Sequence, residues 1–397
     1  MSLPAGFGVN LVASVSGNIG LGVTARSFAA ALEKHGVPFA IADLGHDWGG
    51  THPIGDLGGR VAEYSDELRY PVNLYFMPLV VLDTLFESCP WLLAPGRLHV
   101  ASLWWEASRL PPPWIGKLSR FDAVMASSGF LANVLANDLV LTPVLEAKHP
   151  LSIPAVAADR ARFGLPAQST VFTASLDPNS DPARKNPLGI ISAFRTAFPD
   201  NDADVHLAIR MNNADTDFGR ATVQAMTQAA AGHPRISFLL EPMGYEDVLS
   251  FYASGDAYVS LHRGEGLGLG LMEAMALGKP VIATAWSGNT SFMDYTCGCP
   301  VRYRKAPVLG NWNFFRPEFI GEDAFWADPL LDDAVQWMRK LHEDPAARLA
   351  LGAAAKARIE AYQADAWGRG WIDQLVAFWQ AQRFLPRAAN KLSAIPG

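Results

Sequence analysis

The stretch from Val259 to Thr290 limits the possible folds most, because its pattern predicts a strand, a glycine-rich turn, a helix and a second strand. Residues 257–262 form a short, mostly apolar run with the β-branched Val259, as is typical of a buried parallel strand. Residues 271–277 are strong helix formers, and Gly278 follows where a helix commonly ends. Parallel strands joined through a helix predict an α/β fold.

The turn and helix of this stretch carry two glutamates, Glu265 and Glu273, with seven residues between them. The first N–H groups of a helix have no partner within the helix, so a helix that begins in such a turn can bind an anion. A carboxylate inside the helix can accept hydrogen bonds from paired sugar hydroxyls. The alternative is a turn rich in glycine for packing reasons, with Glu273 merely solvated. The turn glycines are Gly264, Gly266, Gly268 and Gly270.

Composition excludes several classes of protein. The 397 residues carry a net charge of −7, whereas nucleic-acid-binding proteins show a basic surface. Three cysteines cannot form a disulfide framework, and residues 1–16 lack the basic segment of a secretory signal. No run of about 18 apolar residues predicts a membrane span. We therefore expect a cytoplasmic protein, with peripheral membrane contact left open.

The first part of the chain contains a second glycine motif. Residues 7–15 and 37–44 predict strands, and a glycine loop and a helix over 23–35 lie between them. Gly20, Gly22 and Ala25 fit the dinucleotide-binding pattern G-x-G-x-x-A, and Asp43 lies where a ribose-binding acid is expected. This favours, as a second hypothesis, an NAD(P)-binding oxidoreductase. We rank it lower because residues 16–19 separate the motif from its strand.

Polar groups also follow two other predicted strands. Glu106 comes just after the strand over 98–104, where open α/β sheets bind ligands, so it is a candidate for acceptor binding or proton transfer. Its alternative role is a structural partner of Arg109. Arg184 and Lys185 lie in a predicted turn after the strand over 170–176, and two adjacent cations beside a helix start suit a phosphate. Alternatively, Arg184 and Lys185 lie in a solvated turn and bind no ligand.

The rest of the chain continues the α/β alternation. We predict an irregular aromatic segment over 301–319, a turn over 326–329, helices over 330–342 and 346–362, and an amphipathic helix over 367–383. An Ala- and Pro-rich linker is expected over 153–168. Further strands are expected over 71–76, 121–127, 142–145, 205–210 and 236–240, and further helices near 79–88 and over 114–118, 129–137, 188–198, 221–231 and 245–254.

The stretch from Glu265 to Ala283, with E-G-x-G followed by E-A-M-A-x-G-x-P-V-I-A, resembles the E-x7-E signature of retaining GT-B glycosyltransferases of the GT4-like group. The resemblance implies two Rossmann-like domains that face each other across a cleft. We place the acceptor-side domain at 1–160, with a returning helix at about 375–397, and the donor-binding domain at 161–374. The loop at 45–60 is expected to face the acceptor.

The same resemblance assigns roles to the candidate residues. Arg184 and Lys185 would neutralise the donor diphosphate, helped by Arg263, and Glu265 would contact hydroxyls of the transferred sugar. Glu273 would hold the ribose hydroxyls. Further donor contacts are expected from the backbone near Gly20, Gly22, Met243, Gly244, Gly266, Leu267 and Gly268.

The resemblance implies a retaining transfer of a sugar from a UDP- or GDP-linked donor to a glycan, a lipid-linked molecule or a small molecule. No cofactor is expected. No D-x-D-like motif stands at a strand end, since Asp43, Asp47 and Asp56 are scattered, so we also expect no metal requirement. Besides the oxidoreductase, a GT-B relative that binds nucleotide-sugars without transferring them stays open.

Overall fold

The computed structural model describes residues 2–17, 20–45, 54–62, 68–81, 87, 95–199 and 204–382. Contacts divide the chain into two units, one formed by 1–105, 110–152 and 363–397 and the other by 106–109 and 153–362. The domain limits predicted from the sequence stay a prediction. Residues 46–53 of the loop at 45–60, most of the expected helix near 79–88 and the chain after 382 lie outside the described residues.

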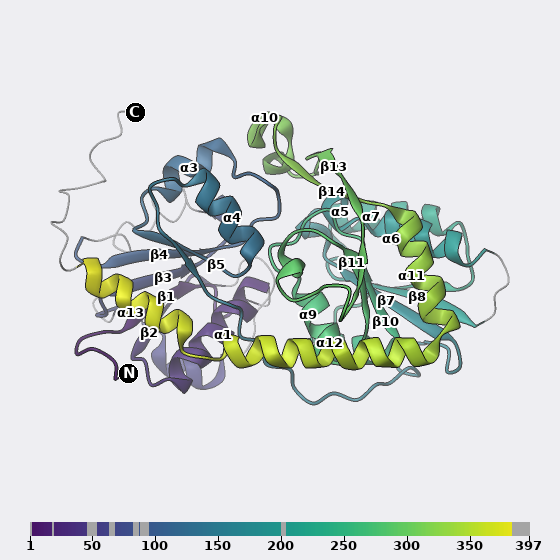
Figure 1. Ribbon diagram of the computed structural model, residues 1–397, viewed down its shortest axis with the longest axis horizontal. Coiled ribbons are helices and arrows are strands. Elements are labelled where there is room, and N and C mark those ends of the chain that lie inside the picture. The colour runs from purple at the N-terminus through teal and green to yellow at the C-terminus, as the bar shows by residue number, and fades with distance from the viewer. Residues whose placement is uncertain are drawn as a thin grey trace. The chain divides into compact units, whose positions relative to one another are not determined.

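The first unit is built on a parallel six-stranded sheet with the order β2-β1-β3-β4-β5-β6. Its core joins side chains of strands β1 to β5 to two helices, α1 (Gly20–Lys34) and α13 (Gly370–Gln382). Figure 1 shows α13 lying across these strands. The strands are β1 (Val9–Ala13), β2 (Phe39–Asp43), β3 (Val72–Phe76), β4 (Leu98–Leu103), β5 (Ala123–Ala126) and β6 (Val144–Glu146). Two further helices are α3 (Pro112–Leu118) and α4 (Gly129–Asp138).

The second unit repeats this plan with a parallel sheet of order β12-β11-β10-β7-β8-β9. Its core packs α6 (Pro187–Ala197) and α11 (Leu331–Glu343) on the sheet, and Figure 1 shows these helices side by side. The strands are β7 (Thr170–Leu176), β8 (Val205–Met211), β9 (Ile236–Leu239), β10 (Ala257–Ser260), β11 (Val281–Thr284) and β12 (Cys299–Val301). The other helices include α5 (Pro182–Lys185), α7 (Asp217–Ala230), α8 (Tyr245–Ser254), α9 (Leu269–Ala276) and α12 (Pro345–Ala366).

The predicted α/β fold with two Rossmann-like sheets is confirmed. The bounds of β7 and α8 agree with the sequence pattern, and Ser128 caps α4 by accepting a hydrogen bond from the Leu131 N–H at 3.2 Å. Helix α7 begins four residues before its predicted start because Thr216 caps it through the Gly219 N–H. In the described part of the chain no helix is both long and apolar enough to cross a membrane.

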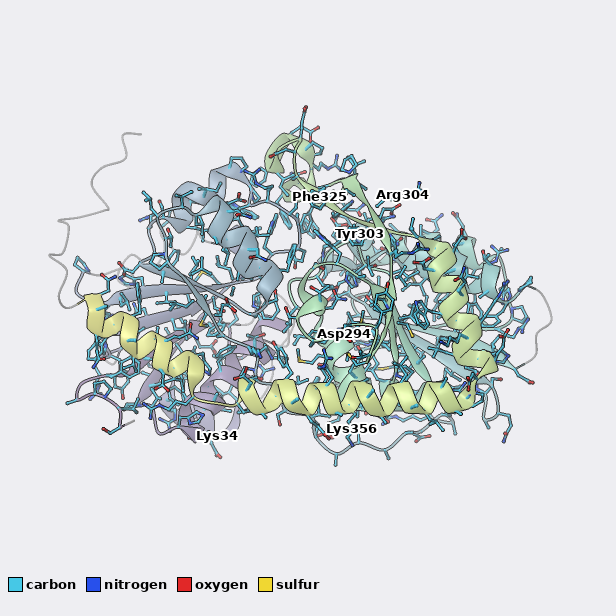
Figure 2. The ribbon with its side chains drawn as sticks, viewed as in Figure 1. Lys34, Asp294, Tyr303, Arg304, Phe325 and Lys356 are labelled. Atoms are coloured by element: carbon cyan, nitrogen blue, oxygen red, sulfur yellow. The ribbon has the colours of Figure 1, made fainter. Side chains whose placement is uncertain are left out.

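Two predictions about the segment after β12 are wrong. Residues Tyr303–Pro307, expected to be irregular, form β13, and Phe325–Pro329, where a turn was expected, form β14. The two strands pair antiparallel, with Tyr303 opposite Pro329; Figure 2 labels Tyr303 and Phe325 on this hairpin. The side chains of β13 are mostly exposed, so no apolar alternation reveals the strand, and its partner lies about 20 residues away.

Candidate functional site

The candidate site lies where two neighbouring parallel strands of the second unit end. Strand β7 is followed by residues 177–186, and β10 is followed by the glycine turn 261–268. Both segments leave the same edge of the sheet because the strands are parallel, which brings the predicted cations to the predicted glutamate. Lys185 Nζ lies 2.5 Å from Glu265 Oε1, and Arg184 Nη1 lies 3.5 Å from the same oxygen.

Arg184 is more deeply buried than a residue of a solvated turn, with 4% of its surface exposed. Its Nε donates to the Ser180 carbonyl at 3.0 Å, and its Nη1 donates to the Gly264 carbonyl at 2.7 Å. The predicted turn is the short helix α5, and the Arg184 carbonyl accepts from the Arg263 N–H at 2.7 Å. Arg184 therefore joins the two loops, while the Lys185 side chain is 22% exposed.

The backbone N–H and carbonyl of Glu265 are both hydrogen-bonded. Its N–H donates to Ser287 Oγ, and its carbonyl accepts from the Gly288 N–H, each at 2.8 Å. A side chain on Gly288 would meet the Gly266 carbonyl, since a Cβ would lie 2.2 Å from that oxygen. Burial alone would raise the pKa of the Glu265 carboxyl, but Lys185 and Arg184 lower it to about 2. Glu265 is therefore an anion at neutral pH.

Glu273 lies on α9 and is 7% exposed. Burial raises its pKa to about 7, although Tyr245 and Arg210 act to lower it. The Tyr245 hydroxyl faces the Glu273 carboxyl and favours its ionised form, and the same carboxyl raises the pKa of Tyr245. A buried carboxylate without a strong cationic partner destabilises the folded protein, because its charge is not compensated. Since Glu273 is buried, it is not the solvated surface residue of the alternative interpretation.

The side chain of the third predicted cation, Arg263, makes an ion pair and a hydrogen bond within the second unit. Its Nε lies 2.8 Å from Asp328 Oδ1 on β14, and its Nη1 donates to the Ala183 carbonyl at 2.6 Å. Its guanidinium also lies 6.0 Å from the centre of the Trp326 ring. Arg263 therefore ties the β13–β14 hairpin to the glycine turn, and any electrostatic effect on a ligand is added to that structural role.

Glu106 joins this cluster, because residues 106–109 group with the second unit. Its Oε1 lies 3.9 Å from Arg184 Nη2, and a Cβ on Gly264 would come within 2.0 Å of the Glu106 carbonyl. Burial raises the pKa of its carboxyl against the attraction of Arg184. Its suggested partner Arg109 instead pairs with Asp323 at 2.6 Å.

Among the other predicted donor contacts, the backbone conformation explains the glycine at position 268, whereas space around position 244 does not require one. Gly244 is the exposed N-cap of α8 next to Met243, and a Cβ there would meet nothing within 4 Å. Gly268, beside the buried Leu267, has φ +92°, so glycine suits its backbone at the start of α9. Direct contacts of these residues with a donor stay predictions.

In the first unit, neighbouring backbone atoms pack closely against part of the glycine loop. A Cβ on Gly22 would lie 2.2 Å from the Gly17 carbonyl, whereas one on Gly20 would meet nothing within 4 Å. Asp43 Oδ1 accepts from the Val15 N–H at 2.9 Å, and also from those of Ser16 and Gly45. The oxygen that the oxidoreductase hypothesis assigns to a ribose therefore already holds the loop after β1.

Sequence reasoning missed several residues that shape the site. Asp181, fully buried, caps α5, and Asn186 caps α6 while its Nδ2 donates to the Leu261 carbonyl at 2.8 Å. The buried His262 ring lies 3.2 Å from Asn289 Oδ1, and burial lowers its pKa. Pro182 and Pro187, at the starts of two helices, were a signal that Asp181 and Asn186 are caps. Within the described ranges, no group of three or more His, Cys, Asp or Glu is arranged to hold a metal ion.

Comparison with known proteins decides the fold. Residues 172–306, which contain both cations and both glutamates, match the family model described as Glycosyl transferases group 1. Sucrose-phosphate synthase from Thermosynechococcus elongatus superposes with a TM-score of 0.65 over 95% of this chain and 99% of that one, at 14% identity. The chain has the GT-B fold. No curated protein sequence matches it.

Two other solved GT-B structures carry ligands. HepE from Anabaena, in complex with UDP and glucose, has a TM-score of 0.59 at 15% identity over 95% of this chain and all of that one. A TarM variant from S. aureus, in complex with Fondaparinux, alpha-GlcNAc-glycerol and UDP, has a TM-score of 0.54 at 11% identity over 78% of this chain. The match spans only 55% of the TarM chain.

Proposed function

We propose that this GT-B chain is a retaining glycosyltransferase that moves a sugar from a UDP- or GDP-linked donor to a glycan, a lipid-linked molecule or a small molecule. The observation that carries the proposal is the contact of Lys185 and Arg184 with Glu265 inside the segment that matches the glycosyl transferase family. Two cations beside an ionised glutamate at a strand end can hold a diphosphate and the sugar attached to it.

In the proposed reaction, the bond between the anomeric carbon and the donor phosphate oxygen breaks. The acceptor hydroxyl oxygen bonds to that carbon from the same face, and its proton passes to the leaving phosphate oxygen. Lys185 and Arg184 stabilise the charge that develops on the leaving group, which is the role of a metal ion in other transferases. This route needs no protein nucleophile, no metal and no cofactor.

The two glutamates have separate tasks in this proposal. Glu265 accepts hydrogen bonds from hydroxyls of the transferred sugar, because its low pKa keeps it ionised. Glu273 accepts from the ribose hydroxyls and is ionised above about pH 7. Glu106, whose Oε1 lies 3.9 Å from Arg184 Nη2, would bind the acceptor or assist the transfer of its proton. We further propose that the protein works in the cytoplasm, in peripheral contact with the membrane when its acceptor is lipid-linked.

Ligand-induced thermal stabilisation with UDP, GDP, ADP and NAD(H) tests the proposal first. A micromolar ligand at millimolar concentration stabilises the native state by roughly 4 kcal/mol. We expect stabilisation by one or more nucleoside diphosphates and its loss in Glu273→Ala and Lys185→Ala. Stabilisation by NAD(H) alone would contradict the proposal and favour the oxidoreductase. The hydrogen bonds that occupy Asp43 argue against that outcome.

A second measurement separates a transferase from a relative that only binds nucleotide-sugars. The purified protein is incubated with the nucleotide-sugar of the base that stabilises it and with a panel of sugar acceptors, and release of nucleoside diphosphate is compared with and without acceptor. Acceptor-dependent release with retained anomeric configuration is the expected result. Binding without release in any mixture would leave the non-transferring relative as the better description.

A further inference from the structure

Asp181 stands out among the charged residues of the second unit because it combines full burial with an unusual backbone. Its exposed fraction is 0%. Its backbone has φ +70° and ψ +104°, a conformation that residues other than glycine rarely adopt. Such strain costs on the order of 1–3 kcal/mol and persists only where the surrounding structure enforces it. The contacts of its carboxylate explain what enforces it here.

The carboxylate of Asp181 accepts hydrogen bonds from the backbone of two distant segments. Oδ1 accepts from the N–H groups of Ala183 at 2.9 Å and Arg184 at 3.3 Å, at the start of α5. Oδ2 accepts from the N–H groups of Asn311 at 2.6 Å and Trp312 at 3.1 Å, in the connection between β13 and β14. One buried side chain therefore joins the cation-bearing helix to a segment 130 residues further along the chain.

This junction has little room for adjustment. A Cβ on Gly310 would lie 2.6 Å from Asp181 Oδ2, so the connection approaches the carboxylate through a glycine. The Ala183 N–H is also near Asn311 Oδ1, at 3.2 Å. On the other side, the Ala183 carbonyl accepts from Arg263, and the Arg184 carbonyl accepts from the Arg263 N–H. The backbone that carries Arg184 and Lys185 is thus fixed between the hairpin connection and the glycine turn.

We propose that Asp181 is a positioning residue, which sets the affinity for the diphosphate part of the donor by tying α5 to residues 311–312. This inference rests on the proposed function of Arg184 and Lys185. Asp181 does not touch the ligand itself, because its two oxygens are engaged by four backbone N–H groups. Its effect is expected on phosphate recognition and not on recognition of the nucleoside.

The test compares the affinities of UDP, UMP and uridine, or their guanosine equivalents, by calorimetry in the wild type and in Asp181→Asn. The amide can keep its oxygen toward Ala183 and Arg184, but its NH₂ group would then face the N–H donors of Asn311 and Trp312. We expect UDP affinity to fall about 10-fold or more while uridine affinity stays within about 2-fold. A general loss of folding would lower both affinities together.

A matched control is Asp177→Ala. Asp177 caps the preceding turn through the Asn179 N–H at 2.9 Å and accepts from Asn213 Nδ2 at 2.8 Å, so its side chain is engaged away from α5 and residues 311–312. We expect its UDP-to-uridine affinity ratio to equal that of the wild type. Asp181→Gly, which relieves the backbone strain and removes the tie, should regain stability relative to Asp181→Ala and still bind UDP weakly.

The outcomes separate this inference from the proposed function. Wild-type protein that binds no nucleoside diphosphate would overturn the proposed function. Wild-type protein that binds UDP, together with an unchanged UDP-to-uridine ratio in Asp181→Asn and Asp181→Gly, would overturn the positioning role alone. Equal losses of UDP and uridine affinity in both variants would show a purely structural residue and would also overturn it.

Discussion

Lys185 Nζ lies 2.5 Å from Glu265 Oε1, although the two residues are 80 positions apart in the chain. Arg184 stands 3.5 Å from the same oxygen, so the first glutamate of the motif is compensated by two cations. Glu273, the second glutamate, forms no ion pair within the described residues, and burial raises its pKa to about 7. The two glutamates of one motif therefore differ in charge state near neutral pH, because only one of them lies beside the cation-bearing loop.

Lys185→Ala is expected to lower nucleoside diphosphate affinity by about 10- to 100-fold, as expected for loss of one charge-assisted contact to a phosphate. Calorimetric titration with UDP or GDP measures the change. Lys356→Ala is the control, since Lys356 is an exposed lysine on α12, labelled in Figure 2. An unchanged affinity in Lys185→Ala would contradict its role at the diphosphate.

Glu273→Gln is expected to change how stability depends on pH. The folded-state pKa is raised from 4.5 to about 7, so the native state binds the proton more tightly than the unfolded chain does. The free energy of unfolding should therefore fall by roughly 3 kcal/mol as pH rises from about 4.5 to about 7, and then level off. The variant should lose this slope in denaturant titrations, while the exposed Glu360→Gln should keep it.

The ionisation of Glu273 also predicts a pH dependence of ligand binding. If the charged carboxylate accepts from the ribose hydroxyls, affinity for UDP or GDP should rise with pH and reach its plateau above about pH 7. Calorimetry from pH 5.5 to 8.5 measures this, with uridine as a ligand that has the ribose but no phosphate that titrates. A flat uridine profile would argue against the ribose contact.

Tyr245→Phe removes a buried hydroxyl that favours the ionised form of the Glu273 carboxyl. The free energy of unfolding should fall by about 1 kcal/mol above pH 7, where that carboxyl is ionised, because the loss of one hydrogen-bond donor costs about this much. Since Tyr245 acts to lower the pKa of Glu273, the variant should move the midpoint of the binding profile to higher pH. Tyr295→Phe, at a side chain that is 63% exposed, should leave the midpoint in place. A lowered midpoint in Tyr245→Phe would contradict the assignment.

Gly22→Ala and Gly20→Ala test why the first glycine loop is rich in glycine. At Gly22 a Cβ would lie 2.2 Å from the Gly17 carbonyl, so we expect a loss of about 1–3 kcal/mol in the free energy of unfolding. At Gly20, the first residue of α1, a Cβ is unobstructed, and alanine should be neutral or stabilising by a few tenths of a kcal/mol. Equal effects at both positions would rule out the packing explanation.

Local sequence was enough to predict most helices and strands, because capping residues and hydrophobic periodicity act over a few positions. The bounds of β7 and α8 and the Ser128 cap are examples. It was also enough to place Glu265, Arg184 and Lys185 at strand ends, since carboxyl ends of parallel strands share an edge. The stretch that resembles the E-x7-E signature lies within residues 172–306, which match the glycosyl transferase family model.

Tertiary structure alone decided which charges meet. The antiparallel pairing of β13 with β14, the link from Asp181 to residues 311–312, and the position of Glu106 beside Arg184 all join segments that are far apart in sequence. A buried carboxylate can satisfy backbone N–H groups from any segment that packs around it, so no local pattern names its partners. For this protein, the sequence determined the elements and the residue types at the strand ends, and packing determined which of them are compensated, strained or left to titrate.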